Sequence, residues 1–200
     1  GFDAEHFSAS VERFHQACAE RAAEHPLNLL ATATHDHKRG EDCRARLAVL
    51  SERAAWYAER VKDWHHLAQP LRSRSLQQAP DGGEEAILYQ ALIGSWPLGL
   101  QADDEVGLDA YLQRLLGWQR KALREAKLNS AWSAPNDEYE AACADFLRRL
   151  LCEPTGLAMR QELVGTVAAV APAGALNSLV QCLLRLTTPG VPDLYQGCEF

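Results

Sequence analysis

The densest group of polar side chains in the sequence is the segment 34–42, Thr-His-Asp-His-Lys-Arg-Gly-Glu-Asp. It follows the short apolar stretch 27–34, which is typical of a buried strand because it is aliphatic, rich in threonine and preceded by Pro26. Parallel α/β folds place catalytic groups at the carboxyl ends of strands, where side chains point into the mouth formed by the loops. We therefore expect His35 and Asp36 to act in a functional site.

Three kinds of site are compatible with this segment. His35 and His37 have the spacing of two metal ligands on one strand, as in metallohydrolases, but such a site needs further ligands, and the other histidines lack suitable spacing. A helical metal-dependent phosphohydrolase is the second kind, and it would hold its His–Asp pair within a helix. In the third kind, Asp36 is one carboxylate of a glycoside-processing site, where anions stabilise an oxocarbenium-like transition state.

A second group of polar side chains follows the predicted strand 191–195, which begins after a Pro-Gly turn and is closed by Gly197. The rule that favours function at the ends of barrel strands applies here as well. The residues it selects are Tyr195, Gln196 and Glu199. Two buried strands alone make no sheet, so we expect that the chain contains only a portion of a larger one.

The other elements that position these residues are predicted to be helices. Apolar side chains recur at helical spacing in the stretches 87–92, 111–116 and 146–151. Further helices are predicted at 8–24, 41–67, 118–129 and 174–186, with another running from Pro154-Thr155 toward Val170. Glu41 and Asp42 would then lie solvated in a first helical turn, where carboxylates complement the helix dipole.

The composition is that of an ordinary globular protein: 200 residues, 47% hydrophobic and 24% charged, with a formal net charge of −7. This acidic balance argues against a nucleic-acid partner, because binding a polyanion requires clustered cations. Pro172 and Gly174 break the longest apolar stretch, so we expect a soluble protein with no membrane partner. The first residues lack a signal-peptide pattern, and a cytoplasmic location is expected.

The six cysteines form no C-x-x-C pair and repeat no spacing, which argues against a zinc knuckle. Cys143, Cys152 and Cys182 lie among apolar residues of predicted helices, where a free thiol behaves as a small hydrophobe. We therefore expect buried, reduced thiols, as in a reducing cytoplasm.

Residues 29–42, LLATATHDHKRGED, resemble a segment of the maltooligosyltrehalose synthases of the α-amylase superfamily. In that family the segment usually reads ATATHDTKR, followed by a small residue, Glu and Asp. Further blocks follow in the family's order, so that the resemblance covers nearly the whole chain. They are 89–97, 121–127 leading to Trp132, and 177–179 through 188–197 with Glu199.

The resemblance implies a (1→4)-α-D-glucan 1-α-D-glucosylmutase, which converts the reducing-end α-1,4 bond of a maltooligosaccharide into an α,α-1,1 bond with retention. Asp36 would be the third carboxylate of the site and stabilise the transition state, His35 would hydrogen-bond the sugar, and Lys38 would reach the adjoining sugar. The other substrate-binding candidates are Arg39, Trp132, Tyr195, Gln196 and Glu199. The nucleophilic aspartate and the acid/base glutamate would belong to the missing N-terminal barrel portion of the same enzyme.

The fold implied is predominantly α for the fragment, with strands 7 and 8 of a (β/α)8 TIM barrel and a large helical insertion. The predicted domains are 1–40 (barrel helix, strand 7 and catalytic loop), 41–172 (insertion) and 173–200 (barrel helix and strand 8). An insertion is predicted because roughly 155 positions separate the strands, against ~30 in a simple βαβ unit. It would wall in the sugar and keep water from the glycosyl intermediate. The fragment alone is expected to be inactive.

Some residues depart from the family pattern. His37 stands where Thr is usual, so we interpret the spacing of His35 and His37 as coincidence and expect neither a metal nor a cofactor. Asn129 stands where His is common, which weakens a sugar-binding role for its loop. Cys43 and Cys198 replace Val and Thr. Trp132 is expected on a loop, where it could stack on a glucose face. Residues expected to be structural or solvated are Trp56, Trp64, Trp118 and the helix face of Lys121, Arg124 and Lys127. A non-catalytic helical interaction module is a further alternative.

Overall fold

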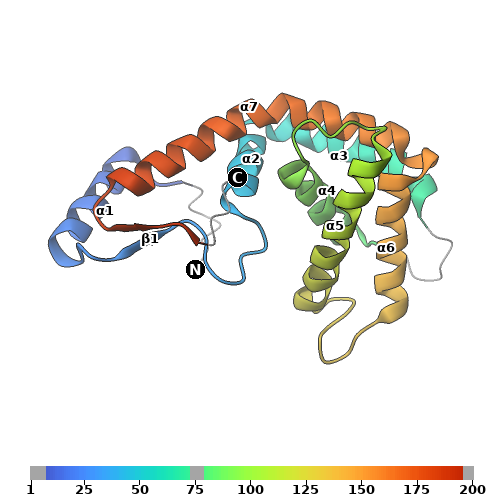
Figure 1. Cartoon of the computed structure of the whole chain (residues 1–200), viewed down its shortest axis with the longest axis horizontal. Helices are drawn as coiled ribbons and strands as arrows, with labels where there is room; N and C mark the ends of the chain where they lie inside the picture. The colour runs from blue at the N-terminus through green and yellow to red at the C-terminus, as the bar shows by residue number, and fades with distance from the viewer. Residues whose placement is uncertain (1–7, 73–78, 196–200) are drawn as a thin grey trace. The chain divides into compact units, whose positions relative to one another are not determined.

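The computed structural model describes residues 8–72 and 79–195, most of them in helices (Figure 1). It divides into two compact units. The first consists of Gly1–Glu41 with Leu176–Phe200, and the second is Asp42–Ala175. Each unit has its own organisation, and each carries some of the residues singled out above.

The first unit contains a pair of parallel strands. Strand β1 (Leu29–Ala31) pairs with β2 (Val191–Asp193), with Leu29 opposite Val191 and Ala31 opposite Asp193. Both strands lie within the predicted ranges but are shorter. Helix α1 (Val11–Glu24) precedes β1, and the Ser10 side chain caps it by accepting from the Arg13 amide.

Helix α7 (Leu157–Thr187) is longer than predicted, because it runs through Pro172 and joins the two helices expected on either side of it. Proline costs about 3 kcal/mol in a helix interior, which burial of neighbouring side chains such as Val167 and Val170 can offset. The segment Pro154–Thr187 is therefore long and apolar enough to cross a membrane, contrary to the expectation above. A single such helix is weak evidence for a span, since core helices pass the same test.

The second unit is a helical assembly with short 3-10 turns. Its elements are α2 (Glu41–Ala48), η1 (Val49–Arg53), α3 (Ala54–Ala68), η2 (Gln69–Leu71), α4 (Gly82–Ser95), α5 (Glu105–Ala126), α6 (Asp137–Cys152) and η3 (Pro154–Gly156), followed by the first part of α7. The predicted helix 41–67 is broken by η1, and the stretches 111–116 and 118–129 belong to one helix, α5. Helices α5 and α6 each begin after a capping side chain: Asp104 accepts from the Gly107 amide and Asn136 from the Tyr139 amide.

Helix α4 lies at the centre of this unit, and its apolar side chains are buried on several sides. The ring of Tyr89 contacts the indole of Trp64, a residue of α3, edge-to-face, with ring centroids 5.5 Å apart. Trp64 is fully buried, and Trp56 and Trp118 pack against the same core, as predicted. The cysteine prediction is only partly right: Cys143 is buried, and burial raises its thiol pKa to about 12, but Cys152 is exposed.

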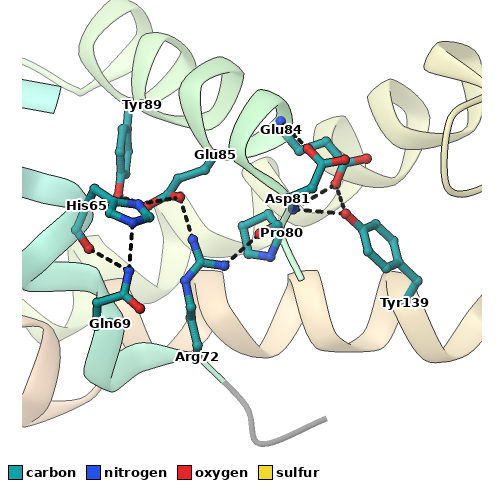
Figure 2. A network of polar contacts seen from close by, with 9 residues as sticks. All are labelled: His65, Gln69, Arg72, Pro80, Asp81, Glu84, Glu85, Tyr89 and Tyr139. Atoms are coloured by element: carbon teal, nitrogen blue, oxygen red, sulfur yellow. Dashed lines mark hydrogen bonds and ion pairs between the residues drawn. The ribbon is translucent and has the colours of Figure 1, made fainter. Parts of the chain in front are cut away.

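Two adjacent carboxylates, Glu84 and Glu85, are buried in the first turn of α4. Successive side chains of a helix point about 100° apart, so the two carboxylates reach different neighbours (Figure 2). Glu84 accepts a hydrogen bond from the Tyr139 hydroxyl of α6. Glu85 accepts from the Tyr89 hydroxyl and from Arg72, and its Oε2 lies 3.0 Å from His65 Nδ1. The pair therefore ties α4 to both α3 and α6.

Glu85→Gln tests the energetic weight of this network. The substitution leaves the buried Arg72 guanidinium without its counter-charge, and uncompensated buried charges cost about 3–5 kcal/mol. The free energy of unfolding, measured by urea denaturation, should decrease by about that amount. The matched control is Glu59→Gln, which breaks an exposed pair with Lys62 and should change stability little. Equal effects of the two substitutions would contradict a structural role for the buried pair.

Candidate functional site

Residues 33–40 form the loop that connects β1 to α2, so the polar segment does follow the carboxyl end of a parallel strand. His35 and Asp36 lie at its tip with exposed side chains, 84% and 58% accessible, and His35 Nε2 is 3.4 Å from Asp36 Oδ2. Asp36 has a φ of +64°. Aspartate is one of the few residues that tolerate this left-handed conformation, and such positions cluster at functional sites.

His37 folds back into the loop instead of projecting beside His35. Its Nδ1 accepts a hydrogen bond from the Thr34 amide at 2.7 Å, which closes a turn. In the part of the chain that the structure describes, no group of three or more His, Cys, Asp or Glu side chains is arranged to hold a metal ion. The His–Asp pair also lies in a loop, whereas a helical phosphohydrolase would hold it within a helix. Neither metal-based alternative gains support from this arrangement.

Two cations follow the pair in the loop. Lys38 is exposed, and its Nζ donates to the Asp36 carbonyl oxygen at 3.5 Å. Arg39 is half-buried. The loop therefore brings an imidazole, a carboxylate and an ammonium group together within four successive residues, a set that can bind sugar hydroxyls and stabilise positive charge at a carbon centre.

The base of the loop contains a buried ion pair that the sequence analysis missed. Glu41 was expected to be solvated, but only 3% of it is exposed. Its Oε1 accepts from the Thr32 hydroxyl at 2.6 Å and lies 3.5 Å from Nη1 of Arg185, a buried residue of α7. A single-sequence pattern cannot reveal this pairing, because Arg185 is 144 positions away.

The polar residues after β2 lie partly outside the described residues. Tyr195 is described and half-buried, next to the exposed Leu194. Gln196 and Glu199 are among the residues that the structure does not describe, so their roles stay predictions. Cys198 lies there as well.

Trp132 belongs to the second unit, on the loop between α5 and α6, with 57% of its surface exposed. The Arg124 guanidinium stacks on its ring, 5.1 Å from the centroid. Arg124 was expected on a solvated helix face, but it makes two hydrogen bonds, of 2.7 and 2.8 Å, to Glu140 of α6. These bonds hold the pKa of the Glu140 carboxyl below its ordinary value, and they fix the guanidinium against the indole.

The Trp132 loop is also anchored at its beginning. The Asn129 amide donates to Asp81 Oδ2 at 2.7 Å and to Glu84 Oε1 at 3.2 Å, which ties the loop to the first turn of α4. Ser130 donates to Glu140, the carboxylate that holds Arg124. Asn129 therefore serves to hold the loop in this chain, where the family commonly has His. Beside it a groove of about 460 Å³ runs between α5 and α6, lined by Arg120, Arg124, Asp137, Glu140 and Arg148 among others.

Comparison with known proteins identifies relatives over the whole chain, although no family model matches it. The chain is 34% identical over 199 residues to a protein of Mycobacterium tuberculosis described as "Putative maltooligosyl trehalose synthase", covering 100% of this chain and 24% of the relative. Over its whole length, the chain is similar to maltooligosyltrehalose synthases. The resemblance inferred from the motifs is thus confirmed.

Solved structures agree with this result. The DSM5389 glycosyltrehalose synthase matches with a TM-score of 0.77 and 33% identity, covering 100% of this chain and 24% of its own. The maltooligosyltrehalose synthase of Arthrobacter ramosus matches with a TM-score of 0.76 and 28% identity, covering 100% of this chain and 23% of its own. The chain therefore spans about a quarter of the length of these synthases.

Proposed function

We propose that this chain is part of the catalytic domain of a cytoplasmic maltooligosyltrehalose synthase. The enzyme would be a glucosylmutase that moves the reducing-end glucose of a maltooligosaccharide from an α-1,4 to an α,α-1,1 linkage. The observation that carries the proposal is the similarity to such synthases along the whole chain, which includes the His35–Asp36 loop after a parallel strand. No cofactor is needed for this retaining transfer.

In this proposal β1 and β2 are strands 7 and 8 of a (β/α)8 barrel, and the helical unit is an insertion between them. The first unit exposes many large apolar side chains, as expected of barrel elements whose neighbours belong to the rest of the polypeptide. Examples are Val11, Leu27, Leu29, Leu179, Leu183 and Val191. The remaining part of the enzyme would cover these side chains and supply the nucleophilic aspartate and the acid/base glutamate.

Asp36 would stabilise the positive charge that develops on the anomeric carbon and hold ring hydroxyls of the distorted sugar. His35, whose ring nitrogen lies next to that carboxylate, would hydrogen-bond the same sugar. The exposed Lys38 would reach the adjoining glucose unit, with Arg39 beside it. Because the transferred glucose must meet a sugar hydroxyl and not water, the helical insertion would shield the glycosyl intermediate.

Asp36→Asn tests the catalytic assignment in the complete enzyme that contains this chain. Asparagine tolerates the left-handed backbone as aspartate does, so the substitution removes the charge and preserves the loop. Trehalose-forming kcat should fall by at least about 10²-fold, the loss typical of removing one transition-state contact. Asp42→Asn, six positions away, should retain activity. Substantial activity of the Asp36 variant, measured by product analysis of maltopentaose reactions, would refute the assignment.

Trp132→Ala tests the sugar-binding role of the helical unit. Stacking of a glucose face on the indole should be worth about 1.4 kcal/mol, so KM for maltooligosaccharides should rise about tenfold. Trp132→Phe keeps an aromatic face and should recover most of the affinity. The ratio of released glucose to trehalose product should rise in the Ala variant if the loop also excludes water. Unchanged KM and product ratio would assign Trp132 a packing role.

A further inference from the structure

The loop that carries His35 and Asp36 is closed at its base by side chains. Thr32 is the residue next to β1, and Glu41 is the first residue of α2, so they flank the loop at its two ends. The Thr32 hydroxyl donates to Glu41 Oε1 at 2.6 Å. This bond joins the point where the chain leaves the strand to the point where it enters the helix.

Arg185, near the end of α7, completes the closure. Its Nη1 donates to the Thr32 hydroxyl oxygen at 3.0 Å and lies 3.5 Å from Glu41 Oε1. Hydrogen bonds thus run in one direction, from guanidinium to hydroxyl to carboxylate, and a charge at each end strengthens them. We call Thr32, Glu41 and Arg185 the loop clamp.

The two charged members of the clamp are buried and Thr32 is half-buried, so the charged pair depends on its contacts within the clamp. Glu41 is 3% and Arg185 8% exposed. An ionised group removed from water must keep its counter-charge and its hydrogen bonds, so neither residue can leave the clamp at small cost. The two ends of the loop are therefore held at a fixed separation and attached to the C-terminal part of α7, which belongs to the same unit.

We infer that the clamp positions the catalytic loop, with Thr32, Glu41 and Arg185 as positioning residues for Asp36. The inference rests on the proposed function, because it assigns a purpose to the position of that carboxylate. Within the loop, His37 and Thr34 close one turn, Lys38 donates to the Asp36 carbonyl oxygen, and the His35 ring lies next to the Asp36 carboxylate. The clamp joins both ends of the loop to each other and to Arg185 of α7, so a change in the clamp should shift the whole loop. An error of about 1 Å in such a group can cost about 10²-fold in rate.

The sharpest test compares two substitutions of Thr32 in the complete enzyme. Thr32→Val keeps the shape and removes the hydroxyl that links Arg185 to Glu41, whereas Thr32→Ser keeps the hydroxyl. We expect kcat per folded enzyme to fall about 10²-fold in the Val variant with KM changed by less than about threefold, and to stay near wild type in the Ser variant. Glu41→Gln, which removes the charge, should resemble the Val variant.

Hydrogen exchange is a second measurement, and it reports on the loop directly. Hydrogen exchange of amides 33–40 should be faster in Thr32→Val and Glu41→Gln than in wild type, while exchange in α4 of the other unit stays the same. The matched control is Glu20→Gln, which breaks the exposed pair with Arg13 in the same unit and should alter neither readout.

Two results would overturn the inference: wild-type kcat and loop exchange in both clamp variants, or a loss of folded protein with kcat per folded enzyme unchanged. Failure of the proposed function has a different signature. If wild type and Glu20→Gln form no trehalose product, the function is wrong, and the exchange rates of residues 33–40 still decide whether the clamp holds the loop.

Discussion

A carboxylate that folding removes from water must find donors, and this requirement organises both units of the chain. In the first unit it applies to Glu41, whose Oε1 accepts from the Thr32 hydroxyl and lies 3.5 Å from Nη1 of Arg185. In the second it applies to Glu84 and Glu85. An unmatched carboxylate in either place would cost several kcal/mol, comparable to the whole stability of a small domain. Each pairing therefore dictates which elements can be neighbours.

In the second unit, this constraint extends from the core to the surface. Glu85 joins α4 to α3 through His65 and to the end of η2 through Arg72, and Glu84 joins α4 to α6 through Tyr139. Burial raises the pKa of the Tyr139 hydroxyl, and the bond to Glu84 raises it further, so the phenol remains a donor. Asn129 binds the same turn of α4 and starts the loop that presents Trp132. The exposed indole is thus at the end of a chain of contacts that begins in the core.

The sequence predicts the elements of this fold better than their pairings. Helical spacing locates α4, α5 and α6, because side-chain periodicity is a local property. The break expected at Pro172 is wrong, since burial of α7 on the N-terminal side of the proline outweighs the lost hydrogen bond. Glu41 and Arg124 are charged residues that resemble solvated ones in sequence, but each is paired with a charged residue that another helix supplies.

The candidate site shows the same division between local and distant information. The motif singles out Asp36 as a candidate, and the structure adds the left-handed backbone and the clamp at the base of its loop. Yet Asp36 is 58% exposed, and a carboxylate in open water stabilises an oxocarbenium ion poorly, because the solvent already screens the charge. Electrostatic catalysis needs a site from which water is excluded. In our proposal, the clamp sets the direction of the Asp36 carboxylate. Water would be excluded from it by the bound sugar and by the barrel strands that we assign to the rest of the enzyme.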